Sequence, residues 1–410
     1  MPNRKISRPP LELIDIIYQV ANIVKLKDIQ YTIDFGCVDD MDSVLGDVFK
    51  VTIKGYCDNQ VIKRNFIMKW IGEPGRRSAF RSLYRRDFAF HKFVVPKMLE
   101  TQKRFQIIEG LRMKFPNCVL SSQDENKECI VFTHILERGY AFGDRLCKID
   151  FNHCSLVIKA LAKLHGLFYA IQNVDKEQSE LLKVFYEDDV QYSGSTPTKN
   201  CMFEFYEKSV DVVNDPIAKK KLYNHTKNIF AILSKCVMPD RFSTICHGDC
   251  WINNIIYTYK GYKPIEVISV DYQISRYASP VTDLSYFLYM CADEDLLNDH
   301  YERLINLYHK TLAAVLRECY LDVNDVYPEQ ILKQHLKKYS VLGLIEALIS
   351  LKIITAVSEE AIEMVKMRYD IAEEVNYDGE SNNESLFVKR VNGVVNDFFR
   401  RGYSLDDVLE

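Results

Sequence analysis

The sequence lacks the cysteine spacings that mark a zinc-binding or disulfide-stabilised protein. Its 12 cysteines are spread singly along 410 residues, and no two of them form a C-x-x-C pair. The closest two, Cys246 and Cys250, bracket a His-Gly-Asp triplet. This spacing fits neither a zinc ribbon nor a small disulfide scaffold, so we expect reduced and mostly buried thiols.

The sequence also lacks an excess of charge of one sign, and it has no long apolar run that is free of charged residues. The formal net charge of -4 argues against a nucleic-acid partner. The most apolar stretch, residues 341–357, contains Glu346 and Lys352, which favours a buried helix over a membrane span. Near the start, Glu12 and Asp15 interrupt the apolar residues, which predicts an amphipathic helix rather than a signal peptide. We therefore expect a cytoplasmic protein with no membrane partner.

The composition is that of a globular enzyme with a large core. The chain is 47% hydrophobic and 27% charged, and it contains 25 tyrosines and 22 phenylalanines. Core packing is the simpler explanation of these aromatic residues, and an apolar substrate cleft is the alternative. We find no internal repeat and expect a monomer.

The hydrophobic pattern divides the chain into a strand-rich part and a helical part. The first part is expected to contain strands at 48–53 and 61–71 that form a hairpin, a helix at 79–99 ending near Pro96, and strands at 105–108 and 129–135. The second part is expected to contain helices at 151–172 and 203–233, a polar loop at 186–200, a strand–loop–strand segment at 242–273, and helices from Ser285 onward with a polar break at 376–384.

This pattern predicts an α+β protein with two lobes. A small strand-rich N-terminal lobe would span residues 1–135, and a large helical C-terminal lobe would span residues 136–410. The segment 242–273 would form a catalytic hairpin at their junction, and the cleft between the lobes is the default ligand site.

Three residues of the hairpin segment predict a metal-assisted reaction. Asp249 and Asn254 lie in one loop, and Asp271 ends the following strand, so strand pairing would bring all three together. Carboxylate and amide oxygens suit Mg²⁺, which shares its coordination with substrate phosphates. In a phosphoryl-transfer site Asp249 would align a hydroxyl nucleophile and accept its proton, while Asn254 and Asp271 would hold the metal.

Two other interpretations of these residues are open. An isolated Asp or Asn in a loop is usually a turn or cap residue. The triplet at His247 also occurs in metallophosphoesterases, but those enzymes need a second cluster of metal ligands. The remaining histidines of the C-terminal half stand apart in helical contexts and are more simply surface or core residues: His225, His300, His309 and His335.

The motif HGDCWINN followed by SVDYQ resembles the signatures of the ecdysteroid kinase-like (CHK kinase-like) family. That family is related to choline and aminoglycoside kinases and has a protein-kinase-like fold. The resemblance implies ATP and Mg²⁺ as cofactors, Asp249 as the base, and Asn254 and Asp271 as metal ligands. Gln273 matches the glutamine that follows the family's metal-binding Asp.

Other segments support the resemblance in the same chain order. Lys69, in FIMKW, stands where such kinases place the lysine that contacts the nucleotide phosphates, although an ordinary strand lysine is the alternative. His165, in LAKLHG, is expected to be a packed, hydrogen-bonded structural residue. Asp283, in PVTDL, is expected to support the loop that carries Asp249.

The resemblance implies that residues 1–135 form the nucleotide-binding lobe, which departs from the family pattern at three places. Asp87 stands where the family has a Glu that pairs with the lysine. The nucleotide-covering loop is poor in glycine, so only Ser43 and the backbone around Gly46 are expected to contact phosphate. The hinge lacks its usual acidic pair, and the backbone of Thr133 and Ile135 is expected to contact adenine.

The function expected from these features is ATP-dependent phosphorylation of a hydroxyl on a small molecule, and the resemblance suggests an ecdysteroid or another hydroxylated apolar compound. One alternative is a catalytically weak pseudokinase that binds nucleotide or another ligand. A kinase for choline-like cationic acceptors is another alternative. Acidic residues that could bind a cation, although solvated loop charge explains them more simply, are Glu187, Asp188, Asp189, Asp293, Glu294 and Asp295.

Overall fold

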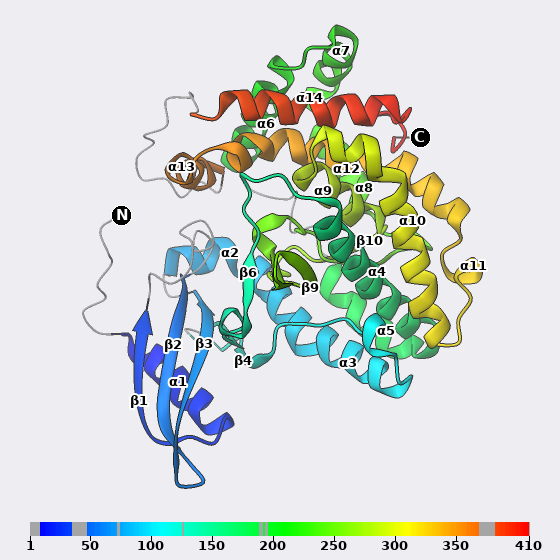
Figure 1. Cartoon of the computed structure of the whole chain (residues 1–410). Helices are drawn as coiled ribbons and strands as arrows, with labels where there is room; N and C mark the ends of the chain where they lie inside the picture. The colour runs from blue at the N-terminus through cyan, green and yellow to red at the C-terminus, as the bar shows by residue number, and fades with distance from the viewer. Residues whose placement is uncertain are drawn as a thin grey trace.

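The computed structural model has the expected α+β architecture of two lobes (Figure 1). It describes residues 9–34, 47–71, 74–124, 127–187, 192, 196–368 and 382–409. The small lobe is an antiparallel five-stranded sheet in the order β1-β2-β3-β5-β4, with helix α1 packed on it. The large lobe is a set of helices that surround two small antiparallel sheets.

The small lobe is built around the predicted hairpin. Its strands are β1 (Lys27–Asp34), β2 (Asp47–Cys57), β3 (Gln60–Trp70), β4 (Cys118–Ser122) and β5 (Cys129–Thr133). The turn between β2 and β3 consists of Asp58 and Asn59, both with positive φ, as a two-residue hairpin turn requires. The amphipathic helix expected near the N-terminus is α1 (Leu11–Ile23), which buries Leu13, Ile17 and Val20.

The strand predicted at 105–108 is wrong. This segment follows helix α3 (Val95–Arg104) as a turn in which Gln106 has a φ of 50°, and the N–H of Ile107 donates back to the carbonyl of Gln102. Ile107 is fully buried beside helix α4 (Phe151–Val174), so the apolar residues cover a helix end. The strands β1 and β4 were not predicted.

Pro96 does not end the helix in which it lies. Helix α2 (Pro74–Ala89) continues through a π-helical turn (Phe90–Val94) into α3. Pro96 lies in the first turn of α3, directly after this turn. Because the preceding turn is helical as well, Pro96 lies within a continuous helical segment, where it has no N–H to donate to that turn.

The large lobe contains the expected helices, with two divisions that the pattern did not show, one before Pro216 and one at a 3₁₀ turn (Thr226–Asn228). The predicted helix at 203–233 is three helices, because Asp215 caps a new helix that begins at Pro216. Residues 196–200 of the predicted polar loop are helical, and most of the break at 376–384 lies outside the described residues. The remaining elements are β6 (Tyr140–Phe142), α5 (Lys176–Lys183), α6 (Thr196–Asp211), α7 (Pro216–His225), α8 (Ile229–Val237), β7 (Thr244–Cys246), β8 (Ile255–Lys260), β9 (Lys263–Ser269), β10 (Arg276–Ala278), α9 (Val281–Cys291), α10 (Glu294–Glu318), α11 (Val323–Val326), α12 (Glu329–Thr355), α13 (Ser358–Arg368) and α14 (Glu384–Arg400).

The longest apolar helices are buried in the core. Every residue of α12 from Tyr339 to Thr355 is buried, which confirms the buried helix expected there. Within the described ranges, α4 is the one helix long and apolar enough to cross a membrane, and 78% of its most apolar window is buried in the structure.

Helices α9 and α12 cross at Gly343, where the two backbones approach closely. All residues of α9 are buried. A Cβ added at Gly343 would lie 2.4 Å from the main-chain carbonyl of Ser285. The glycine is therefore required by the close approach of α12 to α9.

We expect Gly343→Ala to lower the free energy of unfolding by about 1–3 kcal/mol, the usual cost of overpacking a core. Alanine by itself would favour the helix by about 1 kcal/mol, so a loss of stability would show that the clash dominates. Denaturant-induced unfolding measures this difference. The control is Gly110→Ala, where a Cβ meets no atom within 4 Å; equal stability of the two variants would contradict the prediction.

Candidate active site

The β8–β9 hairpin brings the predicted metal ligands together. Ile255 pairs with Ser269, and the N–H of Val270 donates to the carbonyl of Asn254 at 2.9 Å. Asp271 is the next residue, with a left-handed φ of 65° that aspartate tolerates better than most residues. The expected approach of Asp271 to the Asn254 loop is therefore present in the backbone.

Asp249 is held at both of its carboxylate oxygens. Its Oδ2 accepts a hydrogen bond from Asn254 Nδ2 at 2.9 Å, and its Oδ1 accepts one from the hydroxyl of Tyr286 at 2.6 Å. Asn254 also donates to the main-chain carbonyl of Asp249 at 2.9 Å. Asp249 is half-buried, so its orientation comes from these bonds as well as from packing.

Lys69 connects the small lobe to this hairpin. Its Nζ lies 2.7 Å from Asp271 Oδ1, 2.9 Å from Asp87 Oδ2 and 3.4 Å from Gln273 Oε1. Burial alone would lower the pKa of Lys69, but the charges of Asp271 and Asp87 outweigh it and hold the pKa above its usual value. Lys69 is therefore a cation fixed among the predicted site residues.

The shorter carboxylate at Asp87 still reaches Lys69. Only 2% of the Asp87 side chain is exposed, and its second oxygen accepts a hydrogen bond from the N–H of Tyr272 at 3.2 Å. Burial tends to raise the pKa of Asp87, but the charge of Lys69 and the nearby His91 hold it well below its usual range. Helix α2 lies close enough to the segment after Asp271 for the missing methylene to have no effect on the pairing.

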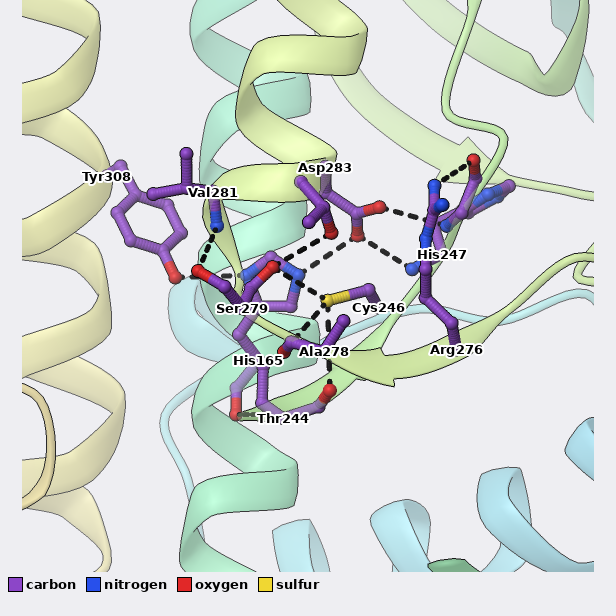
Figure 2. Close-up of polar contacts among 12 residues, drawn as sticks. His165, Thr244, Cys246, His247, Arg276, Ala278, Ser279, Val281, Asp283 and Tyr308 are labelled. Carbon is purple, nitrogen blue, oxygen red and sulfur yellow. Dashed lines mark hydrogen bonds and ion pairs between the residues drawn. The ribbon is translucent and has the colours of Figure 1, made fainter. Parts of the chain in front are cut away.

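The backbone of the His247–Gly248 loop is anchored by Asp283 (Figure 2). The N–H of His247 donates to Asp283 Oδ2 at 2.6 Å, and the N–H of Gly248 donates to Oδ1 at 2.9 Å. Gly248 has a φ of 87°, and a Cβ there would lie 1.9 Å from the carbonyl of Ile274. Only glycine fits this position of the motif.

His247 is a neutral member of the loop. Burial lowers the pKa of His247, despite the opposing charges of Asp283 and Asp271. Its Nδ1 accepts a hydrogen bond from the N–H of Asp249 at 3.2 Å, and its ring packs against Tyr272. These contacts give His247 a structural place beside the candidate base.

His165, Cys246 and Asp283 form a buried cluster that resembles a metal site in composition but not in bonding. Their ligand atoms lie within 4.8 Å of one another. His165 bonds Tyr308 and Asp283, each at 3.0 Å, and the thiol of Cys246 bonds main-chain carbonyls (Figure 2). Burial raises the pKa of Cys246 well above its usual value, so the thiol stays protonated. The cluster is a hydrogen-bonded core, and His165 is the packed residue that was expected.

The predicted nucleotide contacts other than Lys69 lie at or just after the end of β5, or outside the described residues. Thr133 ends β5, and its N–H donates to the carbonyl of Asn117 at 3.0 Å. Ile135 directly precedes a short 3₁₀ turn (Leu136–Arg138). Ser43 and Gly46 lie outside the described residues.

Of the acidic residues considered for a cationic acceptor, those near the start of α10 have partners within the protein, and Glu187 lines a cavity. Lys148 lies 2.6 Å from Asp293 and 3.0 Å from Asp295. Asp293 also caps α10, and Asn396 donates to Glu294 at 3.2 Å. Glu187 is exposed, and residues 188–189 lie outside the described part of the chain.

One cavity of about 250 Å³ is lined by Arg86, Tyr186, Arg276 and Tyr277 among others. Its lining includes Glu187, an acidic candidate for a cationic acceptor, but none of the residues predicted to bind nucleotide or metal or to act as the base. The cavity therefore does not identify the acceptor site.

Sequence patterns missed two residues that contact the catalytic loop. Arg276 donates to the carbonyl of Gly248 at 2.6 Å, and Tyr286 donates to Asp249. Tyr286 stands three residues after Asp283 on α9, but the predicted helix began only at Ser285, so the pattern did not indicate that the two residues share a helix face.

Three solved structures resemble the chain over most of its length. An ethanolamine kinase of Plasmodium vivax has a TM-score of 0.41 and 12% identity, with 97% of this chain and 93% of that chain covered. Choline kinase LicA from Streptococcus pneumoniae has a TM-score of 0.39 and 12% identity, with coverages of 94% and 100%. A variant of aminoglycoside 2′-phosphotransferase-IIIa in complex with GDP has a TM-score of 0.42 and 9% identity, with coverages of 94% and 98%. At these TM-scores the similarity assigns neither a cofactor nor a substrate.

Comparison with curated proteins finds no match for this chain. In contrast, the model of the ecdysteroid kinase-like family matches residues 40–321, which is more than half of the 410 residues. The matched region contains Lys69, the His247–Asp249 loop, Asp271 and Asp283. The chain therefore belongs to the ecdysteroid kinase-like family and is a small-molecule kinase.

Proposed function

We propose that the protein transfers the γ-phosphoryl group of ATP to a hydroxyl of a small molecule. The observation that supports this most directly is the set of contacts around Lys69 and Asp249. Lys69 bonds Asp271, Asn254 bonds Asp249, and the backbone bond from Val270 to Asn254 places the two pairs side by side on the hairpin. Phosphoryl transfer requires these groups and little further covalent chemistry from the protein.

In this mechanism Asp249 orients the acceptor hydroxyl and accepts its proton. Lys69 contacts the phosphates of the nucleotide, with Asp87 holding its ammonium group in place. The oxygen donors of Asn254 and Asp271 fit Mg²⁺, which prefers hard oxygen ligands. When bound, Mg²⁺ would neutralise charge on the transferring phosphoryl group.

The base and the metal-binding residues expected of an active kinase are all present, which argues against the pseudokinase alternative. The family name favours an ecdysteroid or another hydroxylated apolar acceptor over a cationic one. Asp293 and Asp295 are paired with Lys148, which leaves Glu187 as the described acidic residue that could serve a choline-like acceptor. We further propose that residues 1–135 bind the nucleotide, that residues 136–410 carry the catalytic hairpin at 242–273, and that the protein acts as a cytoplasmic monomer.

Nucleotide binding tests the first part of this proposal. We expect ATP to raise the melting temperature of the wild-type protein only when Mg²⁺ is present. Lys69→Ala should weaken ATP binding roughly tenfold to a hundredfold, because it removes a charged partner of the phosphates. The loss of Lys69 also leaves Asp87 and Asp271 without their cation, which lowers the stability of the variant. The affinity is therefore measured by calorimetric titration of folded protein and not by its melting temperature.

The matched control is Lys63→Ala, on the same strand but opposite Lys54 near the β2–β3 turn. Its affinity for ATP should equal that of the wild type. Absence of Mg²⁺-dependent nucleotide binding by the wild type would refute the kinase proposal, and full affinity of Lys69→Ala would refute the phosphate contact.

The role of Asp249 is tested by turnover. With an acceptor found by screening ecdysteroids, other hydroxylated steroids, phenolics and amino alcohols for ADP release, we expect Asp249→Asn to lower kcat by about 10²–10⁴-fold. Asp215→Asn is the control, because asparagine caps a helix as well as aspartate does and Asp215 caps α7. Unchanged turnover in Asp249→Asn would show that Asp249 is not the base.

A further inference from the structure

Tyr286 contacts the candidate base at the oxygen that Asn254 does not occupy. The hydroxyl of Tyr286 donates to Asp249 Oδ1 at 2.6 Å, in the range of charge-assisted O–H···O⁻ bonds. Asn254 donates to the opposite oxygen, Oδ2, at 2.9 Å. Rotation of the carboxylate would therefore break at least one of two hydrogen bonds.

The helix that carries Tyr286 is itself held in place. Tyr286 is 4% exposed, and every residue of α9 is buried. Gly343 of α12 lies against the backbone of Ser285, the residue directly before Tyr286. The tyrosine hydroxyl is thus presented to Asp249 by a tightly packed element.

The same turn of α9 contacts three successive residues of the catalytic loop. Asp283 bonds the N–H groups of His247 and Gly248, and Tyr286 bonds the side chain of Asp249. A spacing of three residues places Asp283 and Tyr286 next to each other on one helix face. Asp283 therefore fixes the loop backbone, while Tyr286 reaches the reacting side chain.

We propose that Tyr286 is a positioning residue that orients the carboxylate of Asp249 toward the acceptor hydroxyl. This inference rests on the proposed phosphoryl transfer. In that step the acceptor oxygen bonds to the γ-phosphorus, the bond to the β,γ-bridging oxygen breaks to release ADP, and the hydroxyl proton passes to Asp249. A carboxylate oxygen has two lone pairs, so an oxygen bonded by Tyr286 can also receive the acceptor hydroxyl.

A purely structural explanation is that any buried tyrosine hydroxyl takes a polar partner. Tyr289, one turn further along α9, illustrates it: its hydroxyl donates to Asp397 at 3.3 Å, and the residue is 1% exposed. Tyr289→Phe is consequently a matched control for Tyr286→Phe. Both changes remove one hydroxyl–carboxylate bond from the same helix, but only one of these bonds involves Asp249.

The experiment measures ADP release with the full-length protein and MgATP, using the acceptor found by the screen or water as the acceptor. Tyr286→Phe should lower kcat roughly tenfold, the order expected for loss of a hydrogen bond to a charged group, with an unchanged KM for ATP. Tyr289→Phe should keep the wild-type kcat. In the Asp249→Asn background, Tyr286→Phe should produce no further loss, because it acts through that carboxylate.

An unchanged kcat in Tyr286→Phe would overturn the inference. It would also be overturned by an equal loss in Tyr289→Phe, or by a full additional loss in the Asp249→Asn background. If the wild type shows neither nucleotide binding nor turnover, the proposed function fails and this inference falls with it. If Asp249→Asn lowers turnover but Tyr286→Phe does not, the inference about Tyr286 is overturned while the proposed function stands.

Discussion

The geometry of the candidate site depends on one buried carboxylate, that of Asp283. Burial would raise its pKa, but the bond and charge of His165 and the charge of Arg276 keep it below the usual range, so it stays ionised. Its two oxygens accept the N–H groups of His247 and Gly248. A buried charge is costly unless it is paired and hydrogen-bonded, and here its partners include the loop that it holds. The contacts that hold the His247–Gly248 loop in its conformation are therefore the same contacts that compensate the charge of Asp283.

A second constraint joins the two lobes at Lys69. The ammonium group bonds Asp87 of α2 and Asp271 after β9, so a strand, a helix and the catalytic hairpin meet at one cation. The pairing with an aspartate rather than a glutamate shows that the separation of helix and strand can compensate for side-chain length. Only the position of the backbone decides whether such a replacement preserves the contact.

Local patterns predicted much of the fold because the hairpins and long helices follow from short-range chemistry. The β2–β3 hairpin has a turn of Asp58 and Asn59, which adopt positive φ more readily than most residues. The prediction failed where distant packing decided the outcome. The apolar residues near Ile107 cover α4 instead of joining the sheet, and Pro96 follows a π-helical turn that no local pattern shows.

By itself the sequence determined the two-lobed α+β architecture and the motif that places Asp249, Asn254 and Asp271 in one hairpin, because hairpin pairing is local and the motif lies within a few residues. It also indicated Lys69 and Asp283 through their own short motifs. Only the tertiary structure decided that Lys69 reaches Asp87, and that Tyr286 of α9 bonds Asp249. Those contacts join residues 18 and 37 positions apart, and their distances depend on how closely helices pack, which in α9 is set by a glycine of another helix.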